Sequence, residues 1–263
     1  MLKKLLKYDI ENILKILTTF YLLALFFGIL TRLFLNIENS FIMNIIGQIC
    51  SGVTISMIVN ILINNLMRLW VRFKKNFYGD EAYLTHTLPL SKKTLYLSKI
   101  LTAVITLFIS IVIIGITLYI AYYSQENIKI LKNILLPVAN ILDSTITKLL
   151  VSFLFVFFLE FVNVLQSGYT GIILGHRMNN TKTAFSILFG FITYILTQVF
   201  VLSIIYIIGL FNQDIMNLFI TNNLVNIDII KFIIYITIII YTIIFVITYI
   251  INNKIFNKGV NID

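Results

Sequence analysis

The chain has few of the residues that build catalytic, metal or disulfide sites. Its 263 residues include one cysteine, two histidines and 11 acidic residues, and charged residues make up 12%. A single cysteine, Cys50, excludes an internal disulfide and a cysteine-cluster metal site. The histidines, His86 and His176, belong to no His-Glu-x-x-His pattern, and we expect both to be ordinary solvated loop residues. Because enzyme chemistry needs clustered acidic residues or histidines, these absences argue against an enzyme and against bound cofactors or metals.

Apolar residues dominate the chain instead. They account for 59% of the sequence and the mean hydropathy is +0.98, whereas soluble domains are about 45–50% apolar. A bilayer core about 30 Å thick needs about 20 apolar residues in a helix, and six stretches satisfy this requirement. These stretches are residues 16–35, 41–67, 100–123, 149–174, 184–211 and 232–251. The sequence therefore predicts an all-α integral membrane protein with six transmembrane helices, in a single transmembrane domain over residues 1–263.

The basic residues are distributed unevenly between the two sides of these predicted spans. If the N-terminus is cytosolic, the inner segments contain 15 of the 20 lysines and arginines. The positive-inside rule therefore predicts that both termini lie in the cytosol. The net charge of +9 then reflects orientation and contact with anionic lipid, and it gives no reason to expect a nucleic-acid partner.

The N-terminal segment 1–15 has its own periodicity. Leucine and isoleucine recur there at helical spacing, while Lys3, Lys7, Glu11 and Lys15 form a polar row. This pattern is typical of an amphipathic helix lying on the inner leaflet. The alternative is that these residues are the charged beginning of the first transmembrane helix.

Two segments on the predicted outer side carry apolar residues among polar ones. Residues 125–148 predict a short surface helix that stops at Pro137, and either Asp143 or Ser144 is a plausible N-cap for the fourth span. Residues 212–228 include Ile215 and Leu224, and this segment either dips back into the outer membrane face or forms a water-exposed loop.

The inner loop 68–99 is the longest charged segment between spans. Gly79 permits a turn, Asp80 can cap a short helix, and Glu81 favours the positive end of that helix. Leu88 and the proline after it stop the helix. Ser91 is then placed to cap a new helix that continues into the third span. The pattern predicts a short, rigid helix attached to two spanning helices, a geometry that can transmit force from a soluble partner. The alternative is an ordinary inner loop whose lysines set the orientation and bind anionic lipid.

Part of this loop resembles a known family. Residues 78–93 read Tyr-Gly-Asp-Glu-Ala-Tyr-Leu-Thr-His-Thr-Leu-Pro-Leu-Ser-Lys-Lys. The run is similar to the Leu-Pro-Val-Ser-Arg/Lys segment of ABC-2 type transporter permeases, and to the Tyr-Gly-Asp-Glu-x-Tyr-Leu-Thr-x-Thr-Leu-Pro version in small bacterial permeases of this kind. Leu90 departs from the pattern, since valine is commoner there. The predicted order of amphipathic start, six spans and coupling loop also agrees with the family.

The resemblance implies a membrane subunit of an ATP-driven exporter in the bacterial cytoplasmic membrane. The chain lacks a Gly-x-x-x-x-Gly-Lys-Ser/Thr phosphate loop, so a cytosolic ABC ATPase subunit would hold the ATP and Mg²⁺. A second permease subunit, identical or related, would complete the complex. The expected cargo is hydrophobic or amphipathic, such as an antimicrobial peptide, a lipid-like molecule or a drug.

The resemblance also assigns roles within the loop. Asp80 and Glu81 would meet basic groups of the ATPase, and three apolar side chains would fill its groove. Arg177, with the histidine before it, would form a smaller second contact, although a plain orientation loop explains these two residues equally well. The residues assigned to ATPase coupling are Gly79, Asp80, Glu81, Tyr83, Leu84, Leu88, Pro89 and Ser91, and those of the second loop are His176 and Arg177.

Within the spans, the outstanding residue is Glu160. A carboxylate in mid-span costs at least about 2–3 kcal/mol and usually faces a bundle interior or water. Asn163 and Ser167 continue the same helical face. This stripe either lines a translocation path or a dimer seam, or it makes packing hydrogen bonds between helices. A polar row on the second span, Ser56, Asn60, Asn64 and Arg68, and the closely spaced glycines 168, 171 and 175 are typical of helix packing.

A different function class is compatible with the same spans. A non-transporting immunity or sensor protein for an antibiotic or bacteriocin would keep six transmembrane helices but would not need an intact coupling loop. Damage to the Asp80–Glu81 segment therefore discriminates between the two functions.

Overall fold

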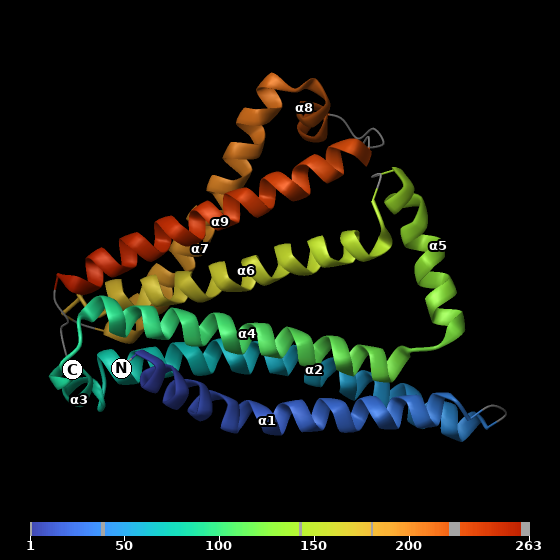
Figure 1. Ribbon diagram of the computed structural model, residues 1–263, viewed down its shortest axis with the longest axis horizontal. Helices are drawn as coiled ribbons and strands as arrows, with labels where there is room; N and C mark the ends of the chain where they lie inside the picture. The colour runs from blue at the N-terminus through green and yellow to red at the C-terminus, as the bar shows by residue number, and fades with distance from the viewer. Residues whose placement is uncertain (1, 38–39, 142–143, 180, 221–226, 259–263) are drawn as a thin grey trace. The chain divides into compact units, whose positions relative to one another are not determined.

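The computed structural model confirms an all-α membrane protein. It describes residues 2–37, 40–141, 144–179, 181–220 and 227–258. Within these ranges, six helices are long and apolar enough to cross a membrane. The helices of the described residues are α1 (Leu2–Leu35), α2 (Phe41–Phe77), α3 (Ala82–Thr87), α4 (Lys92–Tyr122), α5 (Gln125–Ile141), α6 (Ile146–Gly175), α7 (Lys182–Phe211), α8 (Gln213–Ile220) and α9 (Ile227–Asn257) (Figure 1).

The chain divides into two compact units. Unit 1 comprises Met1–Lys75 and Leu88–Ile130, and unit 2 comprises Asn76–Thr87 and Leu131–Asp263. The helix α3 therefore belongs to unit 2, although most of the surrounding chain belongs to unit 1. The single transmembrane domain stays a prediction, and each unit is described by itself.

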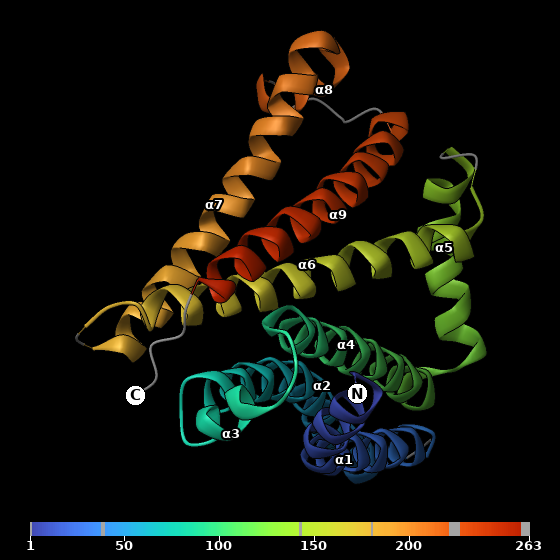
Figure 2. The ribbon, with the colours of Figure 1, turned by 60° about the vertical axis from the view of Figure 1, so that its left-hand side comes forward.

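Unit 1 is a bundle of α1, α2 and α4, which run side by side in both views (Figures 1 and 2). Polar side chains bond these helices together inside the bundle. The Tyr21 and Ser110 hydroxyls are 2.7 Å apart, and Asn65 Nδ2 donates to Ser110 Oγ at 2.8 Å. Because lipid gives little hydrophobic driving force between helices, such bonds and close packing hold a membrane bundle together.

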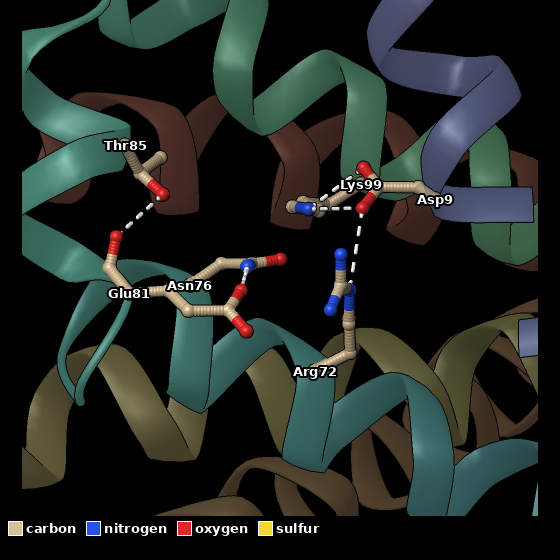
Figure 3. Close-up of polar contacts among 6 residues, drawn as sticks. All are labelled: Asp9, Arg72, Asn76, Glu81, Thr85 and Lys99. Atoms are coloured by element: carbon tan, nitrogen blue, oxygen red, sulfur yellow. Dashed lines mark hydrogen bonds and ion pairs between the residues drawn. The ribbon is translucent and has the colours of Figure 1, made fainter. Parts of the chain in front are cut away.

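The predicted interfacial segment 1–15 is continuous with the first span, in one 34-residue helix. This agrees with the alternative that these residues are the charged beginning of the first transmembrane helix. Apolar burial and ion pairing explain why this segment stays packed against the other helices of unit 1. Ile13 and Leu17 are buried, and the buried Asp9 accepts from Lys99 Nζ at 2.7 Å to both carboxylate oxygens and from Arg72 Nε at 3.4 Å (Figure 3). Asp9 thus attaches the beginning of α1 to α2 and α4.

Unit 2 is built on α6, α7 and α9. The buried residues Val201, Ile240, Tyr241 and Ile244 form an apolar cluster between α7 and α9, with Leu159 of α6 packed against it. Gly171 explains how closely α6 and α7 approach, because a Cβ there would lie 2.5 Å from the Gly190 backbone nitrogen. The glycine spacing on α6 therefore has the packing role that the sequence predicts.

Helices extend into the inner segment 68–99 from both sides. α2 continues to Phe77 and α4 begins at Lys92, directly after Ser91. The lysines and arginines within these two extensions are good helix formers. Lys74 and Lys75 in the last turn of α2 also interact favourably with the helix dipole.

The outer segments differ in detail from the predictions. α5 passes through Pro137 and ends at Ile141, since an exposed proline removes only one helical hydrogen bond. Thr145 caps α6 in place of the predicted Ser144, with its Oγ1 accepting from the Lys148 backbone N–H at 3.3 Å. The other predicted cap, Asp143, lies outside the described residues, as does Leu224 in the 212–228 segment. Residues 213–220 of that segment form α8, which packs on α7.

Candidate functional site

The first candidate site is the short helix α3 in the predicted coupling loop. The backbone N–H of Ala82 donates to the carbonyl of Gly79 at 2.8 Å, which closes the predicted turn. The backbone N–H and Oγ1 of Thr85 both donate to the carbonyl of Glu81, at 3.0 and 2.9 Å. Asp80 precedes the helix and is exposed. The turn and the short helix are therefore present as the sequence predicts.

The end of this segment also follows the prediction. α3 ends at Thr87, directly before Leu88 and the exposed Pro89. Ser91 caps α4, because its Oγ accepts from the backbone N–H of Thr94 at 3.3 Å. The cap satisfies a helix donor that would otherwise lack an intrahelical partner.

Large apolar side chains project from α3 and from the residue that follows it. Tyr83 is 73% exposed, Leu84 is 68% exposed and Leu88 is 41% exposed. These residues lie outside the six candidate spans, so exposure to lipid does not account for them. Exposed apolar side chains that gather in this way are typical of a surface that a partner covers.

Glu81 has an internal role. Its carboxylate accepts a hydrogen bond from Asn76 Nδ2 (Figure 3). Asn76 is buried in the last turn of α2, and Glu81 is half-buried. The bond holds the beginning of α3 against the end of α2, so Asp80 is the more exposed of the two predicted acidic contacts.

Aromatic rings join this segment to the second inner loop. The Tyr78 ring stacks on the His176 ring with centroids 4.3 Å apart, and the Phe77 ring packs against Phe256 of α9 at 4.7 Å. Burial raises the pKa of the Tyr78 phenol above its ordinary value, and the positive charge of Arg177 partly opposes this. The phenol is therefore neutral at physiological pH. The two predicted coupling loops thus meet within unit 2.

The histidines are not ordinary solvated side chains. His176 is fully buried, with Nδ1 2.8 Å from the Ile172 carbonyl oxygen. His86 is half-buried, with Nε2 3.2 Å from the Phe77 carbonyl oxygen. The expectation of solvated loop histidines is therefore wrong, and the reason is the aromatic packing around them. Arg177 is exposed and donates to the Ile255 carbonyl near the end of α9 at 2.8 Å.

The second candidate site surrounds Glu160 on α6. Glu160 Oε1 accepts from Tyr194 Oη and from Gln198 Nε2, both on α7 and both at 2.8 Å. Tyr241 of α9 donates to Gln198 Oε1 at 3.2 Å. The carboxyl group thus belongs to a network that joins three helices of unit 2. Such hydrogen bonds between helices are what the packing interpretation of Glu160 predicts. A role in a translocation path or a dimer seam stays a prediction.

The stripe predicted beside Glu160 faces the interior of unit 2. Asn163 Nδ2 donates to Thr197 Oγ1 on α7 at 3.0 Å, and Ser167 is buried. Several buried polar atoms here have no hydrogen-bond partner among the described residues. They are Glu160 Oε2, Asn163 Oδ1, both side-chain polar atoms of Gln166, Ser167 Oγ and Asn252 Nδ2. An unpaired polar atom in a membrane interior is costly, so these buried atoms carry a cost that the packing of unit 2 must offset.

Sequence reasoning missed part of these sites. The sequence patterns do not single out Asp9, Gln166 or Asn252. Gln166 lies one turn before Thr170 on the face that carries Asn163, and Asn252 directly follows the predicted span 232–251. A search for every amide side chain within the predicted spans would have found Gln166, whereas Asn252 lies one residue beyond the last span. No part of the sequence indicates that Asp9 lies beside Lys99.

Comparison with known proteins does not assign the chain to a family. No protein-family model, curated protein or solved structure matches it. Among the described residues, no group of three or more histidine, cysteine or acidic side chains is placed to hold a metal ion. A functional assignment therefore depends on the loop resemblance and on the contacts described above.

Proposed function

We propose that this chain is the membrane-spanning permease subunit of an ATP-driven ABC exporter. It would move a hydrophobic or amphipathic substrate out of a bacterial cell, using a separate cytosolic ATPase subunit. The observation that carries the proposal is the exposed apolar surface of α3 and Leu88, outside the spans and within the segment that resembles ABC-2 permeases. A soluble ATPase that covered this surface would remove Tyr83, Leu84 and Leu88 from water.

The internal contacts of unit 2 support a mechanical role for α3. A force applied to α3 would reach α6 through the stacked Tyr78 and His176 rings, and α9 through Phe77 and Phe256. The bond between Glu81 and Asn76 attaches the same segment to α2. Movement of α3 would thus be transmitted to helices that cross the membrane, as coupling between ATP hydrolysis and transport requires.

Co-purification in mild detergent tests the proposal. The tagged chain is isolated from its native membranes, and the eluate is assayed for a co-purifying ATPase. We expect an ATPase that is lost when Tyr83→Ala and Leu84→Ala are combined, because these exposed residues contribute to docking and little to folding. The single change Asp80→Lys is expected to weaken the same association through charge repulsion.

A matched control uses two exposed apolar residues elsewhere. Leu131 and Ile134 on α5 are 48% and 63% exposed, and the combined change Leu131→Ala with Ile134→Ala is expected to leave ATPase recovery unchanged. Equal recovery from the α3 and α5 variants would contradict the docking surface. Recovery of folded protein with no ATPase activity would instead favour a stand-alone immunity or sensor protein.

A further inference from the structure

The helix α5, on the predicted outer side, has an exposed apolar face. Ile130, Leu131 and Ile134 are 53%, 48% and 63% exposed, and spacings of three and four residues place them on one face of the helix. α5 is not among the six helices of the described residues that are long and apolar enough to cross a membrane. Exposed apolar side chains that gather outside the spans indicate a surface that another molecule covers.

The opposite face of α5 is polar and basic. Lys129 and Lys132 are exposed and three residues apart, so they share a face. Ile134 follows Lys132 by two positions, about half a turn of the helix, and therefore points away from it. Glu126 is the one acidic residue within the sequence 125–141. Apolar residues on one face and lysines on the other are typical of a helix that lies in the plane of a membrane surface.

Both ends of α5 are held at a membrane surface. Only Tyr123 and Ser124 separate it from α4, and α6 begins shortly after it, at Ile146. Both neighbouring helices are candidate spans. The chain turns directly at the end of α4, because the backbone N–H of Asn127 donates to Ser124 Oγ at 3.0 Å and its Nδ2 donates to the Tyr122 carbonyl at 2.8 Å. α5 therefore cannot move far from the bilayer.

The direction of α5 fits the plane of the membrane. In both views it runs across the axis of α6, with which its residues 131–141 share unit 2 (Figures 1 and 2). The end of α4 marks the depth at which α5 begins. Tyr119 and Tyr123 there are 60% and 40% exposed, with ring centroids 4.6 Å apart, and tyrosine is enriched at the membrane–water interface. α5 therefore begins at the level of the lipid headgroups.

The exposed apolar residues of α3 are in a different environment. The basic segments 68–75 and 92–99 separate α3 from the apolar runs of α2 and α4. No charged residue occurs between the apolar run of α4 and Gln125, the first residue of α5. The bilayer is therefore the neighbour of α5, whereas α3 is kept away from it by charge.

We infer that α5 binds the lipid surface of the outer leaflet, with its apolar face among the acyl chains and Lys129 and Lys132 on anionic headgroups such as phosphatidylglycerol. The positive-inside rule assigns this side of the chain to the outer leaflet. Buried apolar area and attraction to anionic lipid are the two quantities that determine binding of such a helix, and α5 has residues for both. The inference does not depend on the proposed transport function, because it concerns only α5 and the two spans that hold it.

Spin-label accessibility of the full-length protein in nanodiscs tests the orientation of α5. The labels are attached to Ile134→Cys or to Leu136→Cys in a Cys50→Ala background. Leu136 is the matched control, because it is 42% exposed and lies four residues after Lys132, on the lysine face. We expect collisions with oxygen, which concentrates in hydrocarbon, to dominate at position 134. Collisions with a water-soluble nickel chelate should dominate at position 136.

Amide hydrogen exchange of the peptide 125–141 tests the anionic contact. Exchange in nanodiscs that contain phosphatidylglycerol is expected to be slower than in pure phosphatidylcholine, by about fivefold for each lysine. The combined change Lys129→Gln with Lys132→Gln should remove this difference between the two lipids. A difference that the double variant retains would contradict the role of the lysines.

A matched pair of charge substitutions tests the apolar contact in pure phosphatidylcholine. Ile134→Glu should accelerate exchange of the same peptide about tenfold, because a carboxylate among acyl chains is costly and α5 would leave the bilayer. Leu136→Glu, on the lysine face, should leave the exchange rate unchanged. Equal effects of the two substitutions would contradict an apolar face buried in lipid.

Three accessibility results would overturn the inference. Dominant nickel collisions at both positions would show that α5 lies in water. Dominant oxygen collisions at both positions would show that the helix has no side facing the headgroups. Low accessibility to both reagents at position 134, with spin–spin broadening between chains, would show that a second copy of the chain covers the apolar face.

Discussion

Asp9 is a buried acidic residue in the bundle of unit 1, and its neighbours explain how it is tolerated. Lys99 Nζ contacts both of its carboxylate oxygens at 2.7 Å, and Arg72 lies at 3.4 Å. A buried pair of this kind adds little stability compared with apolar residues, yet it is costly to break. The ion pairs instead fix the arrangement of the helices, because the Asp9 carboxylate on α1 contacts cations from both α2 and α4.

The Asp9–Lys99 pair yields a prediction at the residue scale. Lys99→Met should lower the free energy of unfolding by about 3–5 kcal/mol, because Asp9 then keeps a buried charge with a weaker partner. The double variant Asp9→Leu with Lys99→Met should recover most of this loss, since no buried carboxylate remains. Equilibrium unfolding in mixed micelles, analysed as a double-mutant cycle, gives both values. Additive losses would contradict the predicted coupling.

At the scale of elements, the spacing between α6 and α7 organises unit 2. Gly171 and Gly175 allow the backbones of the two helices to touch near Ser186 and Gly190. This close approach brings Tyr194 and Gln198 within reach of Glu160. The network in the membrane therefore depends on small residues that make no polar contact with it.

Gly171→Leu tests this dependence. The new side chain would meet the backbone of α7, and we expect a loss of about 2–3 kcal/mol from overpacking. A thermal melt in detergent should show a Tm lower by about 4–10 °C. Gly52→Leu on α2 is the control, because a Cβ at Gly52 meets nothing within 4 Å. A similar Tm for both variants would contradict the role of the α6–α7 contact.

At the scale of the whole molecule, α2 presents a polar row on an exposed face. Ser56 Oγ, Asn60 Nδ2 and Asn64 Nδ2 each donate to a backbone carbonyl four residues earlier in their own helix. The sequence predicts that this row joins helices, yet Ser56 and Asn60 are exposed in the single chain. Polar residues on a lipid-facing surface usually face another helix, so we predict that a second copy of this chain covers the row.

Disulfide cross-linking tests this interface in native membranes. Asn60→Cys, in a Cys50→Ala background, should form a linked dimer under mild oxidation if two copies pack through α2, since a disulfide requires Cα atoms about 4–7 Å apart. Ile55→Cys is a control on a different face of the same helix, where the side chain is also exposed. Cross-linking at Ile55 equal to that at Asn60 would contradict a specific interface.

The sequence by itself determines the elements of this protein. Long apolar runs can satisfy their backbone groups in lipid only as helices, which is why six spanning helices were predictable. Local chemistry also predicts the turn at Gly79, the stop before Pro89 and the cap at Ser91, because these effects act within a few residues. The end of α2 was less predictable, since this helix extends to Phe77, beyond its apolar run.

Contacts between distant residues are decided only by the tertiary structure. Hydropathy cannot show that Asp9 meets Lys99, 90 residues later, or that Tyr78 stacks on His176. The network around Glu160 likewise requires three helices to be positioned together. The physical reason is that helix formation depends on local composition and spacing, whereas each of these sites depends on which helix faces meet after folding.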